Sequence, residues 1–173
     1  MDDPEGRPVI RLRPLTDADL PLLTGEDAPL DDFGPRPART SVPGCDLNEP
    51  GGFAVLDDSG ELLGNVSWVW QRWGPNVQSR NPIIGIWLAT RGRGHGAGSE
   101  AQRQLVDLFF RHTTVNRVEA YTDLENLAEQ RALEKAGLVR EGVVRGAQWR
   151  DGAYRDGCLY AIVRDDWAAD ADR

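Results

Sequence analysis

Hydrophobic and polar residues alternate over residues 9–15, a pattern typical of a half-buried strand. Thr16 follows this stretch and suits the N-cap of a short helix, which we expect over residues 17–23. Residues 24–52 are rich in Pro, Gly and Asp and show no sustained period. We therefore expect a long irregular segment there, with at most one short helix, and such segments often form binding loops.

The middle of the chain predicts a hairpin and one further strand. Residues 53–56 and 62–70 flank the sequence DDSG at 57–60, which is typical of a hairpin turn. We expect a loop over residues 71–82. The apolar run at 83–88 predicts the strand that follows this loop.

The second half contains two helical patterns. Residues 98–111 place Ala101, Leu105, Leu108 and Phe109 on one face of a helix. Residues 125–136 predict a second helix, which ends at Gly137 in the position of a C-terminal cap. Three more strands are predicted, and the last two form a hairpin around residues 150–152; they cover residues 117–122, 138–149 and 154–163. This order of elements predicts a mixed α/β sheet with helices packed on it, in one domain spanning residues 1–173.

Composition narrows the class of protein. The chain has no run of about 18 apolar residues, so we expect no membrane span. Its acidic start has no apolar signal region, and Cys45 and Cys158 show neither a metal-ligand spacing nor a disulfide framework. These features predict a cytoplasmic protein without a metal site. The net charge of −8 argues against a nucleic-acid partner and is compatible with a cationic one, although such a charge also serves solubility.

A glycine-rich turn lies between the strand at 83–88 and the helix that follows it. A strand that ends in glycines and turns into a helix leaves several backbone N–H groups unpaired, and the helix dipole adds partial positive charge. The turn therefore predicts an anion site for a phosphate or pyrophosphate. No Gly-Lys-Ser/Thr follows the glycines, which argues against a nucleotide P-loop. The residues of the turn are Arg91, Gly92, Arg93, Gly94, His95, Gly96, Ala97 and Gly98.

Several segments of the second half match one family layout in the right order. They are residues 84–88 with the glycine-rich turn and Glu100-Ala101, residues 121–126 with 132–138, and a tail that includes Glu141-Gly142, residues 154–156 and Asp166-Trp167. Together these segments resemble the GNAT N-acetyltransferases, in the variant of the RimJ/RimL branch, which includes ribosomal-protein N-terminal acetyltransferases. The likeness covers residues 83–167 well and the first strand and helix loosely.

The resemblance implies the GNAT fold, a mixed and mostly antiparallel sheet that opens between the strands at 83–88 and 117–122. It implies acetyl-coenzyme A as the acyl donor, with its pyrophosphate on the amides of residues 91–98. The pantetheine arm would run beside Ile86, Trp87 and Leu88, and Asn126 would hold it near its thiol end. Without the family, Asn126 is equally an N-cap or loop residue. Arg91, Arg93 and His95 either add charge beside the phosphates or are solvated loop side chains.

Two departures from the family pattern bear on the mechanism. The branch commonly has Ser three residues after this Asn, near the departing thiol, and Glu129 occupies that position here. Other branches have Tyr seven residues after the Asn, and here that residue is Leu133. Glu129 is therefore either an acid or base in catalysis or a charged residue on the wet face of a helix. The same departures leave open a coenzyme A-binding sensor or interaction module without turnover.

The acceptor is an amine, which must be neutral to attack the thioester directly. An α-amino group is about a tenth neutral at pH 7 and a lysine amine only roughly 0.04%. An alkylamine substrate therefore needs a positioned carboxylate, while an N-terminus needs little from a base. The carboxylates that qualify by type alone are Asp31, Asp32, Glu49 and Glu119. The strand amide facing the thioester carbonyl would stabilise the oxyanion.

Trp68 and Trp70 share one face of their strand, and Trp73 lies close by in the sequence. With Phe33 they either wall an acceptor pocket or pack in the core. The sequence leaves several acceptors open, namely a ribosomal-protein N-terminus, another peptide, an aminoglycoside-like drug and a small metabolite. It also leaves open an acyl group larger than acetyl, and a monomer or a homodimer.

Overall fold

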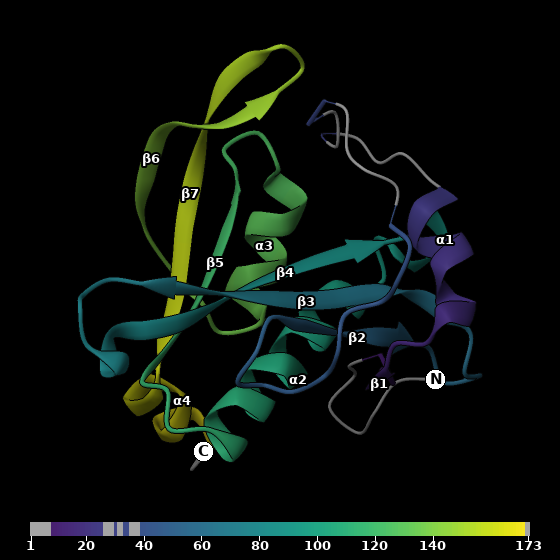
Figure 1. The fold of residues 1–173 in the computed structure, drawn as a ribbon, viewed down its shortest axis with the longest axis horizontal. Coiled ribbons are helices and arrows are strands. Elements are labelled where there is room, and N and C mark those ends of the chain that lie inside the picture. Colours follow the sequence, from purple (N-terminus) through teal and green to yellow (C-terminus); the bar gives the residue numbers. More distant parts are fainter. Residues whose placement is uncertain (1–7, 26–29, 31–32, 35–38, 172–173) are drawn as a thin grey trace.

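The computed structural model describes residues 8–25, 30, 33–34 and 39–171, and Figure 1 shows how its elements are arranged. Seven strands form one sheet in the order β1-β2-β3-β4-β5-β7-β6. The strands are β1 Arg11–Pro14, β2 Gly51–Leu56, β3 Leu62–Arg72, β4 Arg80–Leu88, β5 Arg117–Asp123, β6 Val139–Arg150 and β7 Ala153–Val163. The helices are α1 Leu20–Gly25, α2 Ala97–His112, α3 Leu127–Lys135 and α4 Arg164–Ala171.

The sheet is antiparallel except at its centre, where β4 and β5 are parallel. The chain passes from β4 to β5 through α2, which packs on the sheet because its apolar residues recur at helical spacing. The predicted mixed sheet, its strand order along the chain and its flanking helices are therefore confirmed.

The core lies between the sheet and the two helices α2 and α3, which cover one face (Figure 1). Phe109 of α2 packs edge-on against Trp68 of β3, with ring centroids 5.5 Å apart. Leu133 of α3 and Val118 of β5 are fully buried in the same cluster. Strand side chains alternate between faces, so Arg117, Glu119 and Tyr121 of β5 point to the opposite face, which these helices leave uncovered.

The predicted loop at 71–82 is too long, because β3 continues to Arg72 and β4 already begins at Arg80. The two strands pair through Gln71 with Asn81 and Arg72 with Arg80. This end of the hairpin carries polar side chains, so hydrophobic alternation does not reveal it. The guanidinium of Arg80 instead lies over the Trp70 ring, 4.0 Å from its centroid.

Helix boundaries differ from the prediction by one or two residues, and one helix was missed. Asn126 caps α3, which therefore begins at Leu127 instead of 125. Gly137 closes α3 as predicted, since it has a φ of +93° and Leu138 N bonds to Leu133 O. The C-terminal helix α4 has only Trp167 as a large apolar residue, which packs on Phe110 with 5.4 Å between ring centroids. One large apolar residue gives no helical periodicity, so the sequence pattern did not predict this helix.

Candidate active site

The strands β4 and β5 are hydrogen-bonded over only part of their length. Their pairing joins Ile83 to Glu119 and Ile84 to Ala120, and it ends there. Both strands continue, β4 along β3 to Leu88 and β5 along β7 to Asp123. Figure 1 shows them diverging. Beyond the last pair the edges of the two strands are no longer paired with each other. We call this stretch the split, and the predicted splayed pair is confirmed.

The turn after β4 leads into α2 through two left-handed glycines. Gly94 and Gly96 have φ values of +81° and +83°, which residues with a Cβ adopt only at a cost. The first hydrogen bond of α2 runs from Glu100 N to Gly96 O at 3.1 Å. The amides of the first helical turn therefore have no acceptor within the helix.

This end of α2 lies against the end of β4. A Cβ added to Gly98 would stand 3.6 Å from Leu88 and 3.7 Å from Ile86. The free amides of α2 and the β4 edge of the split are thus neighbours. The helix dipole favours an anion at this place.

The cations of the turn are engaged in different ways. Arg93 Nε donates to Leu88 O at 2.8 Å, while its Nη2 is buried without a partner among the described residues. Arg91 is already used, because it donates to Leu62 O at 2.5 Å and pairs with Glu61 at 3.1 Å. His95 is exposed.

Two other predicted positions of the turn have packing roles. Gly92 is buried, its amide bonds to Ala89 O at 2.9 Å, and a Cβ there would come within 3.1 Å of Leu63. Ala97 is part of the core. The amides that remain for an anion are therefore those from about Gly94 to Ser99, a narrower set than the sequence indicated.

Asn126 lies where the chain turns from β5 into α3. Its Oδ1 accepts a hydrogen bond from Glu129 N at 3.2 Å, so the side chain caps the helix. The preceding turn is held by Arg150 of β6, whose Nε donates to Asp123 at 2.8 Å with both side chains almost fully buried. Sequence reasoning missed this pair, since Asp123 and Arg150 are brought together only by the sheet.

Glu129 is half-buried at the start of α3, beside Gln102 of α2. Burial raises the pKa of Glu129 from 4.5 to about 7, and a hydrogen bond with the Gln102 side chain opposes this rise without cancelling it. Gln102 is itself fully buried, and its Oε1 has no partner among the described residues. Gln102 was also missed, although a polar residue on the apolar face of a predicted helix was a readable signal.

The tryptophans do not form one acceptor pocket. Trp68 is only 2% exposed and donates to Glu49 O at 2.6 Å, so it belongs to the core, and its interpretation as a pocket wall is wrong. Trp70 is half-buried and packs edge-on against Phe109, with 6.1 Å between ring centroids. Trp73 is different, because it is 62% exposed and donates to Glu119 at 2.6 Å.

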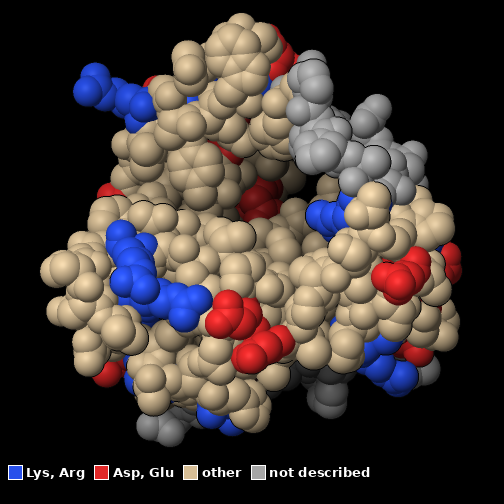
Figure 2. All heavy atoms as spheres, in the orientation of Figure 1, with Lys and Arg blue, Asp and Glu red and all other residues tan. Residues whose placement is uncertain are grey.

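The four candidate carboxylates are separated by the fold. Glu119 is buried on β5 beside the last β4 pair, and the Glu49 side chain is exposed. Asp31 and Asp32 lie outside the described residues. Figure 2 shows the uncovered face of the sheet hollowed between the β6–β7 hairpin and β3–β4, with acidic atoms at the bottom where α3 lies in Figure 1.

The site combines an open edge between parallel strands with the amide-rich start of a helix. Comparison of the chain with known protein families identifies the family to which it belongs. The model of the acetyltransferase (GNAT) domain matches residues 10–139. The chain belongs to this family. A search of curated proteins finds no match.

Solved acetyltransferase structures share the fold. A chimera of spermidine N-acetyltransferase SpeG from Vibrio cholerae and hSSAT has a TM-score of 0.73 at 20% identity, over 92% of this chain and 98% of the other. The ribosomal-protein-S5-alanine acetyltransferase from Vibrio fischeri has a TM-score of 0.60 at 24% identity, over 69% and 64%. RimJ from Mycobacterium smegmatis, in complex with CoA-disulfide, has a TM-score of 0.59 at 24% identity, over 71% and 61%.

The matched region covers less than two thirds of the S5-alanine acetyltransferase and RimJ chains. The match to the GNAT acetyltransferase domain supports acyl transfer from acetyl-coenzyme A in general, and these neighbours show the shared fold. No helix in the described part of the chain is both long and apolar enough to cross a membrane.

Proposed function

We propose that this protein transfers the acetyl group of acetyl-coenzyme A to a primary amine. The observation that carries the proposal is the split itself. It leaves the edges of β4 and β5 unpaired, with the unsatisfied amides of α2 next to β4 and with Asn126 after the end of β5. An elongated ligand with a diphosphate at one end and a thioester at the other fits this arrangement.

The residues present suit coenzyme A at each end. The amides of residues 94–99 can donate to an anion with the dipole of α2 behind them, and the unpartnered Nη2 of Arg93 offers a further donor. At the other end the Oδ1 of Asn126 is used by the cap, which leaves its amide NH₂ group for a pantetheine carbonyl. Gly92 and Arg91, which the sequence also assigned to this site, contribute through the fold of the turn.

When bound, acetyl-coenzyme A supplies a thioester whose carbonyl carbon bonds to the neutral amine nitrogen while the carbon–sulfur bond breaks. The nitrogen then loses one proton and the thiolate gains one. A backbone N–H of β4 that faces the split, at Gly85 or Ile86, stabilises the charge on the carbonyl oxygen. No covalent enzyme intermediate is required.

Glu129 is the group we assign to the proton of the thiolate. It stands three residues after Asn126, on the first turn of α3, and is half-buried. A carboxyl with a pKa of about 7 is partly protonated at neutral pH and is a stronger acid than a thiol with a pKa near 8.5. The hydrogen bond from the Gln102 side chain lowers the pKa of Glu129, so burial is what keeps the carboxyl partly protonated.

We infer the class of the acceptor from the chemical group that the neighbours' substrates share and from the charge of this chain. The named neighbours act on ribosomal proteins and on spermidine, and all of these substrates present an amine. The excess of acidic residues in this chain suits a cationic acceptor. We extend the proposal to the cytoplasm as the place of action, because acetyl-coenzyme A is the donor.

Steady-state release of coenzyme A thiol tests the proposal, with a panel of amines that includes N-terminal peptides, alkylamines and aminoglycosides. We expect amine-dependent release and a product heavier by one acetyl group in mass spectrometry. Tight binding of acetyl-coenzyme A without release by any amine would instead identify a sensor or interaction module.

A further inference from the structure

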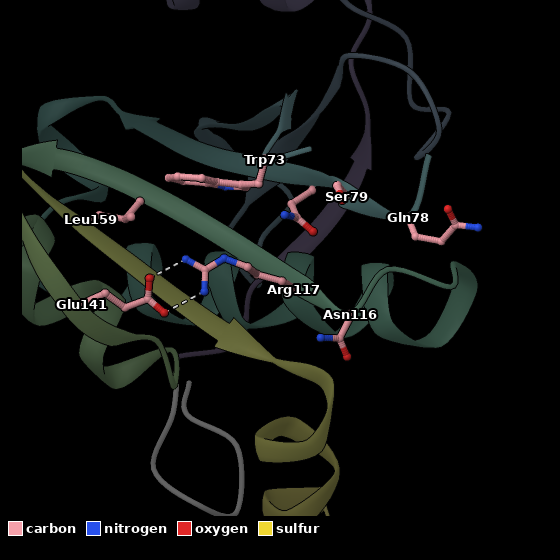
Figure 3. A pocket seen from close by; sticks show the side chains of 8 residues that line it. Trp73, Gln78, Ser79, Asn116, Arg117, Glu141 and Leu159 are labelled. Atoms are coloured by element: carbon pink, nitrogen blue, oxygen red, sulfur yellow. Dashed lines mark hydrogen bonds and ion pairs between the residues drawn. The ribbon is translucent and has the colours of Figure 1, made fainter. Parts of the chain in front are cut away.

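A second depression, of about 450 Å³, lies on the uncovered face of the sheet at the closed end of the split. Figure 3 shows Trp73 on one side of it and the Arg117–Glu141 pair on the other. Asn81 of β4 and Leu159 of β7 complete much of the wall. The depression is therefore built from four strands and the β3–β4 hairpin.

Glu119 lies beneath this depression and is completely buried. Its Oε1 accepts from Trp73 Nε1 and Arg117 Nε, each at 2.6 Å, and from Asn81 Nδ2 at 3.5 Å. All three donors line the depression. Its Oε2 has no partner among the described residues. A buried carboxylate oxygen without a donor is costly, so a ligand in the depression that supplies a donor to this oxygen would be stabilised.

The charges around Glu119 do not balance. Arg117 is shared between two carboxylates, because it also makes two hydrogen bonds to Glu141, at 2.6 and 2.5 Å. This contact lowers the pKa of Glu141 and keeps it ionised. The other lining residues are uncharged. One positive charge thus faces two negative charges, and the depression carries one excess negative charge.

Trp73 adds an aromatic surface to this charge. Its indole N–H is fixed by Glu119, yet the side chain is 62% exposed. An exposed indole ring whose edge contacts a carboxylate is a favourable place for an ammonium group, because the ring face and the carboxylate both attract it.

We propose that this depression binds a second cationic group of the acceptor, so that the substrate class is a di- or polyamine. The inference rests on the proposed function. Glu119 pairs with Ile83, and the thioester is expected beside residues 85–86 of β4. Two to three residues of strand separate these positions, which corresponds to roughly 7–10 Å between the reacting amine and the second charge.

The test compares diaminohexane with hexylamine, which differ only in the second amine. Binding of each amine is measured by calorimetry in the presence of coenzyme A, and kcat/KM by thiol release. We expect the diamine to be preferred about tenfold by wild type, and Glu119→Gln to lose most of this preference. Trp73→Leu, at an exposed position, should reduce it as well, while Asp165→Asn on α4 serves as the matched charge control and should keep it.

Equal binding of the two amines by wild type, or an unchanged preference in Glu119→Gln, would overturn the inference. These outcomes differ from a failure of the proposed function. If both amines are acetylated at similar kcat/KM, the proposed transferase activity stands and the proposed site for a second charge is wrong. If diaminohexane binds selectively but no thiol is released, the proposed site for a second charge stands and the proposed transferase activity is wrong.

Discussion

The side chain of Asn126 accepts its hydrogen bond from the backbone N–H of Glu129, at 3.2 Å. The residue assigned to the pantetheine and the residue assigned to the thiolate proton are thereby held in one helical turn. A change at Asn126 consequently affects both the start of α3 and the ligand.

Substitutions at Asn126 separate these two effects. Asn126→Ser keeps a capping oxygen but loses the amide donors, so we expect an unchanged melting temperature and about tenfold weaker coenzyme A binding. Asn126→Ala should lose binding and about 1 kcal/mol of stability as well. Calorimetric titration and thermal unfolding measure the two quantities. Full coenzyme A affinity in Asn126→Ser would limit this residue to capping.

Arg93 and Arg91 form a matched pair two residues apart. Arg93→Gln should weaken coenzyme A binding about tenfold, because it removes the buried Nη2 group that has no partner among the described residues, in the residue just before the free amides. Arg91→Gln should change the affinity little, since its guanidinium is engaged with Leu62 and Glu61. The affinities are compared at one low ionic strength, where charge effects are largest. Equal losses in both variants would contradict the assignment.

The glycine turn permits a test that separates backbone strain from anion repulsion. Apart from its two chain neighbours, no atom of the described residues lies within 4 Å of a Cβ at Gly94, but its φ of +81° strains any other residue. Gly94→Ala should therefore cost about 1–2 kcal/mol of stability and keep most coenzyme A binding. Gly94→Glu should cost a similar amount and abolish binding, and Gly96→Glu should behave likewise. If both Glu variants retained their affinity for coenzyme A, the anion site could not lie at this turn.

Glu129 should make stability depend on pH. Its folded pKa of about 7 lies above its ordinary value of 4.5, so the free energy of unfolding is highest below pH 4.5 and falls as the pH rises to 7. The loss is about 3 kcal/mol at most, and Glu129→Gln should remove it. In the pH profile of kcat, the change near pH 7 should be absent from Glu129→Gln, whereas the unrelated Asp165→Asn should retain it. Identical pH profiles for Glu129→Gln and wild type would exclude Glu129 as the acid.

Most of the fold could be predicted from the sequence, because the hydrophobic residues of α2 and of the central strands recur at a regular spacing and pack into one core. It failed where packing gives no period, as in the polar end of the β3–β4 hairpin and in α4 with its single Trp167. For the site, the turn and Asn126 could be found because their chemistry is local. The pairs Trp73–Glu119 and Asp123–Arg150 could not, since residues 46 and 27 positions apart meet only in the folded sheet.

A crystal structure of the complex with acetyl-coenzyme A tests the central claim most directly. The account predicts the diphosphate on the amides of residues 94–99, the pantetheine between β4 and β5 against Asn126, and the thioester sulfur near Glu129. Density for the ligand at another place, or β4 and β5 paired along their whole length with the ligand bound outside them, would contradict it.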